Sequence, residues 1–194
     1  MRKQIANLVS NILNPFLVSL VIILLLSFES TRSPLDALRW SAILVAISIV
    51  PVYSVVVYFS RNDRLGSRFI NVRKQRTKIY LLAGICALVG CVILIYLEAP
   101  LILLATFVAG LSATVIFMGI NLWWKISLHA AFIAASVILL VILYGSLGTV
   151  TVMLLPLVGW ARVELGHHSL AQVTTGAFLA ALIVGGVFYL FGLV

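Results

Sequence analysis

The sequence predicts an all-α, polytopic membrane protein, and two observations support this fold class. The 194-residue chain is 63% hydrophobic and only 9% charged, whereas ordinary soluble domains carry about 25% charged residues. Apolar runs close to the ~20 residues needed to cross a bilayer recur along its whole length. These runs do not alternate apolar and polar residues as a transmembrane β-barrel would. We therefore expect one integral membrane domain over residues 1–194, a helical bundle with about seven (six to seven) transmembrane helices.

Seven apolar segments are the candidate transmembrane helices. In chain order they are 12–28, 40–60, 79–97, 101–120, 128–145, a sixth from about 148 into the stretch 160–172, and 170–194. Pro51 and Pro156 fall inside two of them and should kink the helix, because proline lacks the backbone donor. The first segment follows Arg2 and Lys3, as in a signal peptide. However, "SFESTRSP" offers no small-x-small cleavage site, so we expect a retained helix.

The basic residues are distributed unequally between the two sides of the predicted membrane. Of the 13, only Arg32 and Arg39 fall opposite the N-terminus. The other eleven share the N-terminal side: Arg2, Lys3, Arg61, Arg64, Arg68, Arg73, Lys74, Arg76, Lys78, Lys125 and Arg162. The positive-inside rule then makes the N-terminal side cytoplasmic and leaves the C-terminus outside. Four of the eleven are also candidate site residues, namely Arg73, Arg76, Lys125 and Arg162. Without them, seven basic residues remain on the N-terminal side against two on the other side.

Three polar segments fall on that same side. They are "NVRKQRTKIY" (71–80), "LWWKISLH" (122–129) and "WARVELGHHSLAQ" (160–172). A helical bundle can bring them together at one membrane face. Their candidate site residues are Arg73, Arg76, Lys125, Ser127, His129, Arg162 and His168. Guanidinium groups suit phosphate oxygens, and histidine can act as an acid, a base or a nucleophile.

Each of these residues also has a structural interpretation. The arginines can serve as topology signals that meet anionic headgroups or as anchors that extend to the interface. Trp123 and Trp124 are typical interfacial anchors. His129 can be hydrogen-bonded to a neighbouring helix. A metal site is the weaker hypothesis, because His167 and His168 are adjacent and would point in different directions on a helix, with no HExxH motif or carboxylate cluster nearby.

The order of these motifs resembles the type 2 phosphatidic acid phosphatase (PAP2, lipid phosphate phosphatase) superfamily, in a compact prokaryotic membrane branch. The family pattern is Lys-x6-Arg-Pro, then Pro-Ser-Gly-His, then Ser-Arg-x5-His-x3-Asp. Here "ARVELGHHSLAQ" keeps Arg162 and His168 at the x5 spacing, "ISLH" keeps Ser127 and His129, and "RKQRT" matches the first motif loosely through Arg76.

Several positions depart from the pattern. Phe69 stands seven before Arg76, where the family has lysine, and the second motif lacks its proline and glycine. Ala161 replaces the serine of the third motif, and Gln172 replaces its aspartate. A neutral amide oxygen can still accept the Nδ1–H bond of His168 and fix the tautomer, without stabilising an imidazolium by charge. Glu164, four residues before His168, is the alternative orienting group if the two share a helix face.

The resemblance implies a metal-independent lipid phosphatase. His168 would form a phosphohistidine, and His129 would protonate the leaving oxygen. Arg76 and Arg162 would bind the phosphate, together with either Lys125 or Arg73. Ser127 would add a hydroxyl donor. The substrate would be phosphatidic acid, phosphatidylglycerophosphate or a polyprenyl diphosphate. We expect no cofactor, metal or nucleic-acid partner. The alternatives are an inactive lipid-binding or structural relative of the same fold, and a small anion or lipid transporter.

Overall fold

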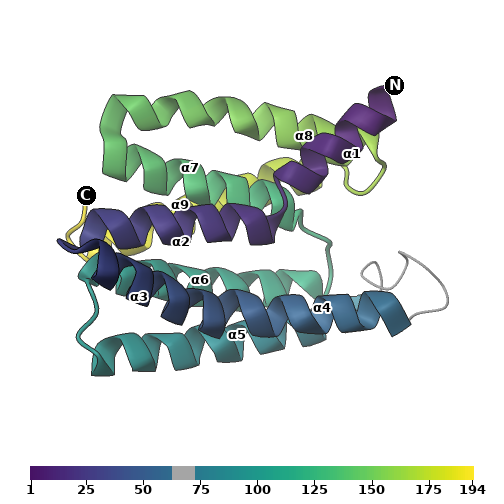
Figure 1. The fold of residues 1–194 in the computed structure, drawn as a ribbon. Coiled ribbons are helices and arrows are strands. Elements are labelled where there is room, and N and C mark those ends of the chain that lie inside the picture. The colour runs from purple at the N-terminus through teal and green to yellow at the C-terminus, as the bar shows by residue number, and fades with distance from the viewer. Residues whose placement is uncertain (63–72) are drawn as a thin grey trace. The chain divides into compact units, whose positions relative to one another are not determined.

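The structure is a computed structural model that describes residues 1–62 and 73–194, with side chains described for 1–59 and 76–194. All regular structure in this described part is helical, as the sequence predicts. The elements are α1 (Arg2–Ile12), α2 (Pro15–Ser30), α3 (Pro34–Leu44), the π-helical turn η1 (Val45–Ile49), α4 (Val50–Asn62), α5 (Arg73–Tyr96), α6 (Leu101–Asn121), α7 (Leu128–Tyr144), the 3-10 helix η3 (Gly145–Met153), α8 (Leu154–Glu164) and α9 (Leu170–Leu190) (Figure 1).

Six helical stretches of the described chain are long and apolar enough to cross a membrane. They are Arg2–Ser30, Pro34–Phe59, Arg76–Tyr96, Leu101–Asn121, Leu128–Glu164 and Leu170–Leu190. Each overlaps a segment that hydropathy predicts. This confirms the all-α membrane fold class, and the protein is an integral membrane protein.

The longest candidate, Leu128–Glu164, is a hairpin. The chain reverses at Gly145, whose positive φ of 57° is a conformation that glycine adopts without strain. Helices α7 and α8 then pack on each other through Ile133, Val137 and Val158 (Figure 1). The two arms of this hairpin correspond to the predicted segment 128–145 and to the one that runs from about 148 into the stretch 160–172. The six candidate helices therefore cover all seven predicted apolar segments.

Pro51 and Pro156 each lie just after a segment that departs from α-helical geometry, while the kink that the sequence predicts at each stays a prediction. Pro51 follows the π-helical turn η1, and Pro156 follows the 3-10 helix η3. The residue four before each proline lies in that non-α segment. Proline has no N–H to donate to the carbonyl of that residue, and its ring would clash with the same carbonyl in an α-helix. Local rewinding of the helix accommodates the missing bond.

The first candidate span is broken between α1 and α2. Asn14 begins α2: its Oδ1 accepts hydrogen bonds from the backbone N–H groups of Phe16 and Leu17, both at 3.0 Å. Pro15 occupies the first helical position, where its lack of an N–H costs nothing. The capping asparagine and the proline together explain why α1 is a separate short helix.

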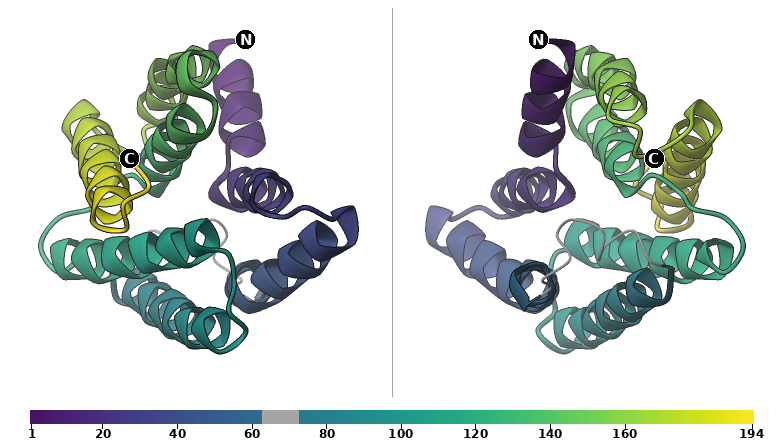
Figure 2. Two further views of the ribbon diagram at one scale, coloured as in Figure 1. Left: turned by 90° about the vertical axis from the view of Figure 1, so that its left-hand side faces the viewer. Right: turned by 90° about the vertical axis from the view of Figure 1, so that its right-hand side faces the viewer.

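Contacts divide the described chain into two compact units. The first comprises Met1–Ile22 and Lys125–Val194, and the second comprises Ile23–Trp124. In the first unit α7 packs on α9 and on the returning arm η3–α8, while α1 packs on α8, as Figure 2 also shows from two sides. In the second unit α5 packs mainly on α6, with η1 and α4 also against it.

One glycine allows the start of α9 to approach the start of α7. A Cβ added at Gly176 would lie 2.8 Å from both Ile126 Cγ2 and the Ser127 carbonyl oxygen. Any larger side chain would push the two helix starts apart. Gly176 thus brings together the segments that carry most of the predicted site residues.

Candidate functional site

Polar residues gather in the first unit where α7 begins, α8 ends and α9 begins. The Ser127 N–H donates to the Gln172 carbonyl oxygen at 3.2 Å. Lys125 Nζ donates to the His167 carbonyl oxygen at 3.0 Å. The segments 125–129 and 160–172 therefore lie against each other within the first unit, 42 residues apart in the chain at the Lys125–His167 bond.

His168 is held by a neutral side chain. It is only 9% exposed, and its Nδ1 lies 3.2 Å from Gln172 Oε1. The same Oε1 accepts the Ser169 backbone N–H at 3.2 Å. A backbone N–H can only meet the oxygen of the amide, so this contact fixes the orientation of the Gln172 amide. Nδ1 of His168 must then donate, so Nε2 is the unprotonated nitrogen of the neutral ring.

The Gln172 amide is positioned by the local sequence. Ser169 is the N-cap of α9, and its hydroxyl accepts the Gln172 N–H at 3.3 Å. The Gln172 side chain returns to the Ser169 backbone, which completes a capping box. Ser169 is a functional candidate that the motif comparison missed. The S-x-x-Q spacing of "SLAQ" was the available signal.

Arg162 reaches from the last turn of α8 to α1. Its Nη1 donates to Ser10 Oγ at 2.8 Å. Its carbonyl oxygen accepts the N–H groups of His167 and His168, at 3.1 and 3.3 Å. Arg162 thus fixes the backbone turn that places His168 and also binds α1. A cation in the last turn of a helix is further favoured by the helix dipole.

His129 and Ser127 lie at the start of α7. The Ser127 hydroxyl caps this helix by accepting the Ala130 N–H at 3.4 Å, and the residue is fully buried. His129 contacts the backbone of Ser10 and lies near Arg162 and His167. The site residues predicted in the second and third motifs therefore share one neighbourhood.

Glu164 forms an ion pair with Arg2 at 3.2 Å, with 23% and 76% of the two side chains exposed. Helix α8 ends at Glu164, and the chain turns at Gly166 with a φ of 67° before His168. Glu164 and His168 therefore do not lie on one helix. The orienting role predicted for Glu164 requires a shared helix face, which these two residues do not have. Gln172 is the residue that faces His168 Nδ1.

His167 differs from its neighbour. Its side chain is exposed, and it belongs to the connection between the end of α8 at Glu164 and the start of α9 at Leu170. Partial burial, the Arg162 guanidinium and the Lys125 ammonium together lower the pKa of His167 from its ordinary value of 6.5. Arg162 and Lys125 therefore make the surroundings of the His167 ring electropositive.

Arg76 belongs to the second unit. It is 6% exposed, and its Nη2 lies 3.4 Å from the Tyr80 hydroxyl, with the guanidinium 6.0 Å from the centre of the same ring. Asn121 Nδ2 donates to Thr77 Oγ1 at 3.2 Å and joins the start of α5 to the end of α6. The predicted phosphate-binding role of Arg76 stays a prediction. The side chain of Arg73 lies outside the described residues.

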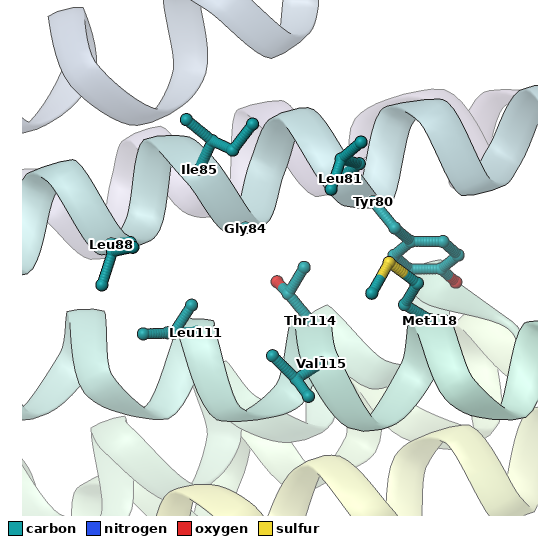
Figure 3. Close-up of a pocket in the computed structure, with 9 residues that line it drawn as sticks. All are labelled: Tyr80, Leu81, Gly84, Ile85, Leu88, Leu111, Thr114, Val115 and Met118. Carbon is teal, nitrogen blue, oxygen red and sulfur yellow. The ribbon is translucent and has the colours of Figure 1, made fainter.

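An apolar groove of about 220 Å³ runs between α5 and α6, within the second unit (Figure 3). Its lining residues are Tyr80, Leu81, Gly84, Ile85, Leu88, Leu111, Thr114, Val115 and Met118. Tyr80 and Met118 lie at one end and Leu88 and Leu111 at the other. Hydrocarbon is the chemistry that fits this lining.

The first unit brings together two cations, Lys125 and Arg162, and two histidines, His129 and His168, and these four residues form the first-unit cluster. The tautomer of His168 is fixed by Gln172. Guanidinium and ammonium groups are suited to binding phosphate oxygens, and an unprotonated histidine nitrogen is a nucleophile. Comparisons with protein-family models, curated proteins and solved structures find no match for the chain.

Proposed function

We propose that the protein is an integral membrane lipid phosphatase of the PAP2 type, acting through a phosphohistidine at His168. The observation that carries the proposal is the contact between His168 Nδ1 and Gln172 Oε1 at 3.2 Å. With Gln172 oriented by the Ser169 N–H, Nδ1 of the neutral His168 ring carries the proton and Nε2 is the unprotonated nitrogen. Nε2 is then the atom available to attack phosphorus.

The mechanism proceeds in two steps. His168 Nε2 attacks phosphorus, the bond to the lipid oxygen breaks, and His129 gives its proton to that oxygen. A water then attacks the phosphohistidine, the P–N bond breaks, and His129 takes up the proton of the water. Arg162 and Lys125 stabilise charge on the equatorial oxygens, and Ser127 adds a hydroxyl donor. No metal is required for either step.

The proposed substrate is a lipid phosphate whose tail stays in the bilayer. Phosphatidic acid, phosphatidylglycerophosphate and polyprenyl diphosphate share this chemistry. The cluster lies where spanning helices begin and end, which is the depth of a lipid headgroup. The positive-inside rule predicts that the N-terminal side, to which the sequence assigns eleven basic residues, is cytoplasmic.

One observation favours a second candidate, an inactive phospholipid-binding protein of the same architecture. The capping box gives Gln172 a structural role at the start of α9 that needs no catalysis. Such a protein would bind the same phosphate through Arg162 and Lys125 without turning it over. A transporter has less support, because these ionisable residues cluster at helix ends and not at mid-membrane.

Release of inorganic phosphate tests the proposal. Purified protein with a metal chelator should release phosphate from at least one of the three lipid classes. The adjacent histidines provide a matched pair: His168→Ala should lower the rate by about 1,000-fold or more, because covalent catalysis is lost. His167→Ala should retain most of the activity. Equal rates for wild type and His168→Ala on all three substrates would contradict the proposal.

A further inference from the structure

Helix α1 contributes a buried polar residue to the cluster from the far end of the sequence. Ala6 and Ser10 are 0% and 5% exposed. They lie four residues apart, so they share the face of α1 that packs on α8 (Figures 1 and 2). Ser10 Oγ accepts from Arg162 Nη1 at 2.8 Å, across 152 residues of sequence. Its backbone also contacts His129.

The direction of the Arg162 bond determines what the Ser10 hydroxyl can do. A guanidinium only donates, so the serine oxygen is the acceptor and its own proton can go to another acceptor. The positive charge on Arg162 polarises the hydroxyl and makes it a stronger donor. A hydroxyl that is nearly excluded from solvent is costly without a partner for its proton. An anionic oxygen bound beside Arg162 would be that partner.

The opposite face of α1 suits lipid. Ile5, Leu8 and Ile12 are 51%, 60% and 58% exposed, and their i, i+3, i+7 spacing places them on one side of the helix. Arg2 and Lys3 stand at its start. This is the form of an amphipathic helix at a membrane interface. Helix α1 therefore presents hydrocarbon contact outside and a hydroxyl inside.

We propose that Ser10 is a further ligand-binding residue of this site, whose hydroxyl donates to an oxygen of a phosphomonoester group held by Arg162. A phosphomonoester has three non-bridging oxygens, enough to meet Arg162, Lys125 and Ser10 together. The inference rests on the proposed function in placing the phosphoryl group at Arg162. It does not require that the group be hydrolysed.

Inorganic phosphate is the probe for the test, titrated calorimetrically into the full chain in phosphatidylcholine nanodiscs. Ser10→Ala should weaken phosphate binding about tenfold, the effect of one lost charge-assisted hydrogen bond. Ser136→Ala is the matched control. Ser136 is a buried serine of α7 whose hydroxyl donates to the Phe132 carbonyl at 2.7 Å, and its removal should leave phosphate affinity unchanged.

Two further arms complete the design. Ser10→Cys keeps the side-chain size with a poorer donor, and should also weaken phosphate binding even if Ser10→Ala does not fold. Phosphatidic acid added to the nanodiscs should compete with phosphate if the ligand is a lipid headgroup. A lack of competition would assign the same site to free phosphate.

The results separate this inference from the proposed function. Phosphate binding that Ser10→Ala weakens, without any hydrolysis of lipid phosphates, would support the inference and remove the phosphatase. Hydrolysis by wild type with equal or tighter phosphate binding by Ser10→Ala and Ser10→Cys would overturn the inference and leave the phosphatase. Wild type that binds no phosphate would also overturn the inference.

Discussion

At the scale of single residues, the proposed mechanism depends on one side-chain amide, that of Gln172. Gln172 stands where the PAP2 pattern, which the sequence resembles, has an aspartate. Its Oε1 accepts hydrogen bonds from both the Ser169 N–H and His168 Nδ1. The amide can fix a tautomer but cannot offset the charge of an imidazolium. Substitutions at this position separate these two effects.

Replacing Gln172 changes the acceptor while the helix cap can be retained. Gln172→Glu preserves the S-x-x-E capping box and adds charge, so we expect phosphate release at or above the wild-type rate. Gln172→Met removes the acceptor and should slow release by about 10- to 100-fold, the usual cost of losing a hydrogen bond that orients a reactive histidine. Steady-state kinetics with a lipid phosphate measures both variants. Wild-type activity in Gln172→Met would remove the orienting role.

The pKa of His167 is sensitive to the positive charges of Arg162 and Lys125. Its folded-state pKa is lowered from 6.5 by partial burial, Arg162 and Lys125, so between the two pKa values the unfolded chain binds more protons. Acidification through that window therefore disfavours folding, and stability from this residue is restored as pH rises past 6.5. Lys125→Gln should shift the His167 titration, followed by imidazole NMR, to higher pH. An unshifted midpoint would contradict the proximity of the two groups.

At the scale of elements, the contact between the starts of α7 and α9 positions the site. The two helix starts approach closely because residue 176 has no side chain. The Ser127 N–H bond to the Gln172 carbonyl lies at this contact. A change that separates the helices should therefore affect both stability and activity.

Glycines of α9 provide a controlled test of that contact. Gly176→Ala places a Cβ 2.8 Å from Ile126 and Ser127 atoms, and should destabilise the fold by about 1–3 kcal/mol and lower activity. Gly185→Ala, where nothing lies within 4 Å, should change stability by less than about 1 kcal/mol. Reversible unfolding in mixed detergent compares the two. Equal stability losses would contradict the close approach.

Some features of the fold can be predicted from the sequence, whereas others depend on tertiary packing. Hydropathy located the apolar segments, because burial in lipid requires long apolar runs. The π-helical and 3-10 segments before Pro51 and Pro156 were not predicted, since the sequence indicated only kinks there. The capping box was visible in "SLAQ" and was missed because the site was compared with a carboxylate pattern. Ser10 could not be found, because a serine in an N-terminal helix carries no sign of an arginine 152 positions later. Tertiary packing alone supplies that contact.

At the scale of the whole molecule, the hairpin at Gly145 determines topology. If Leu128–Glu164 crosses twice, the chain makes seven passes and its ends lie on opposite sides. Fusion of a reporter after Val194 should then give an external signal, while an N-terminal tag should be cytoplasmic. A cytoplasmic signal from the Val194 fusion would indicate an even number of passes and remove the proposed orientation.

The central claim is that His168 becomes phosphorylated during turnover. Wild-type protein mixed with lipid phosphate labelled at phosphorus and quenched within one turnover should carry label that is stable to base and labile to acid. The label should map to His168, persist in His167→Gln and vanish in His168→Gln. Phosphate release without any labelled histidine, or label in His168→Gln, would contradict the account.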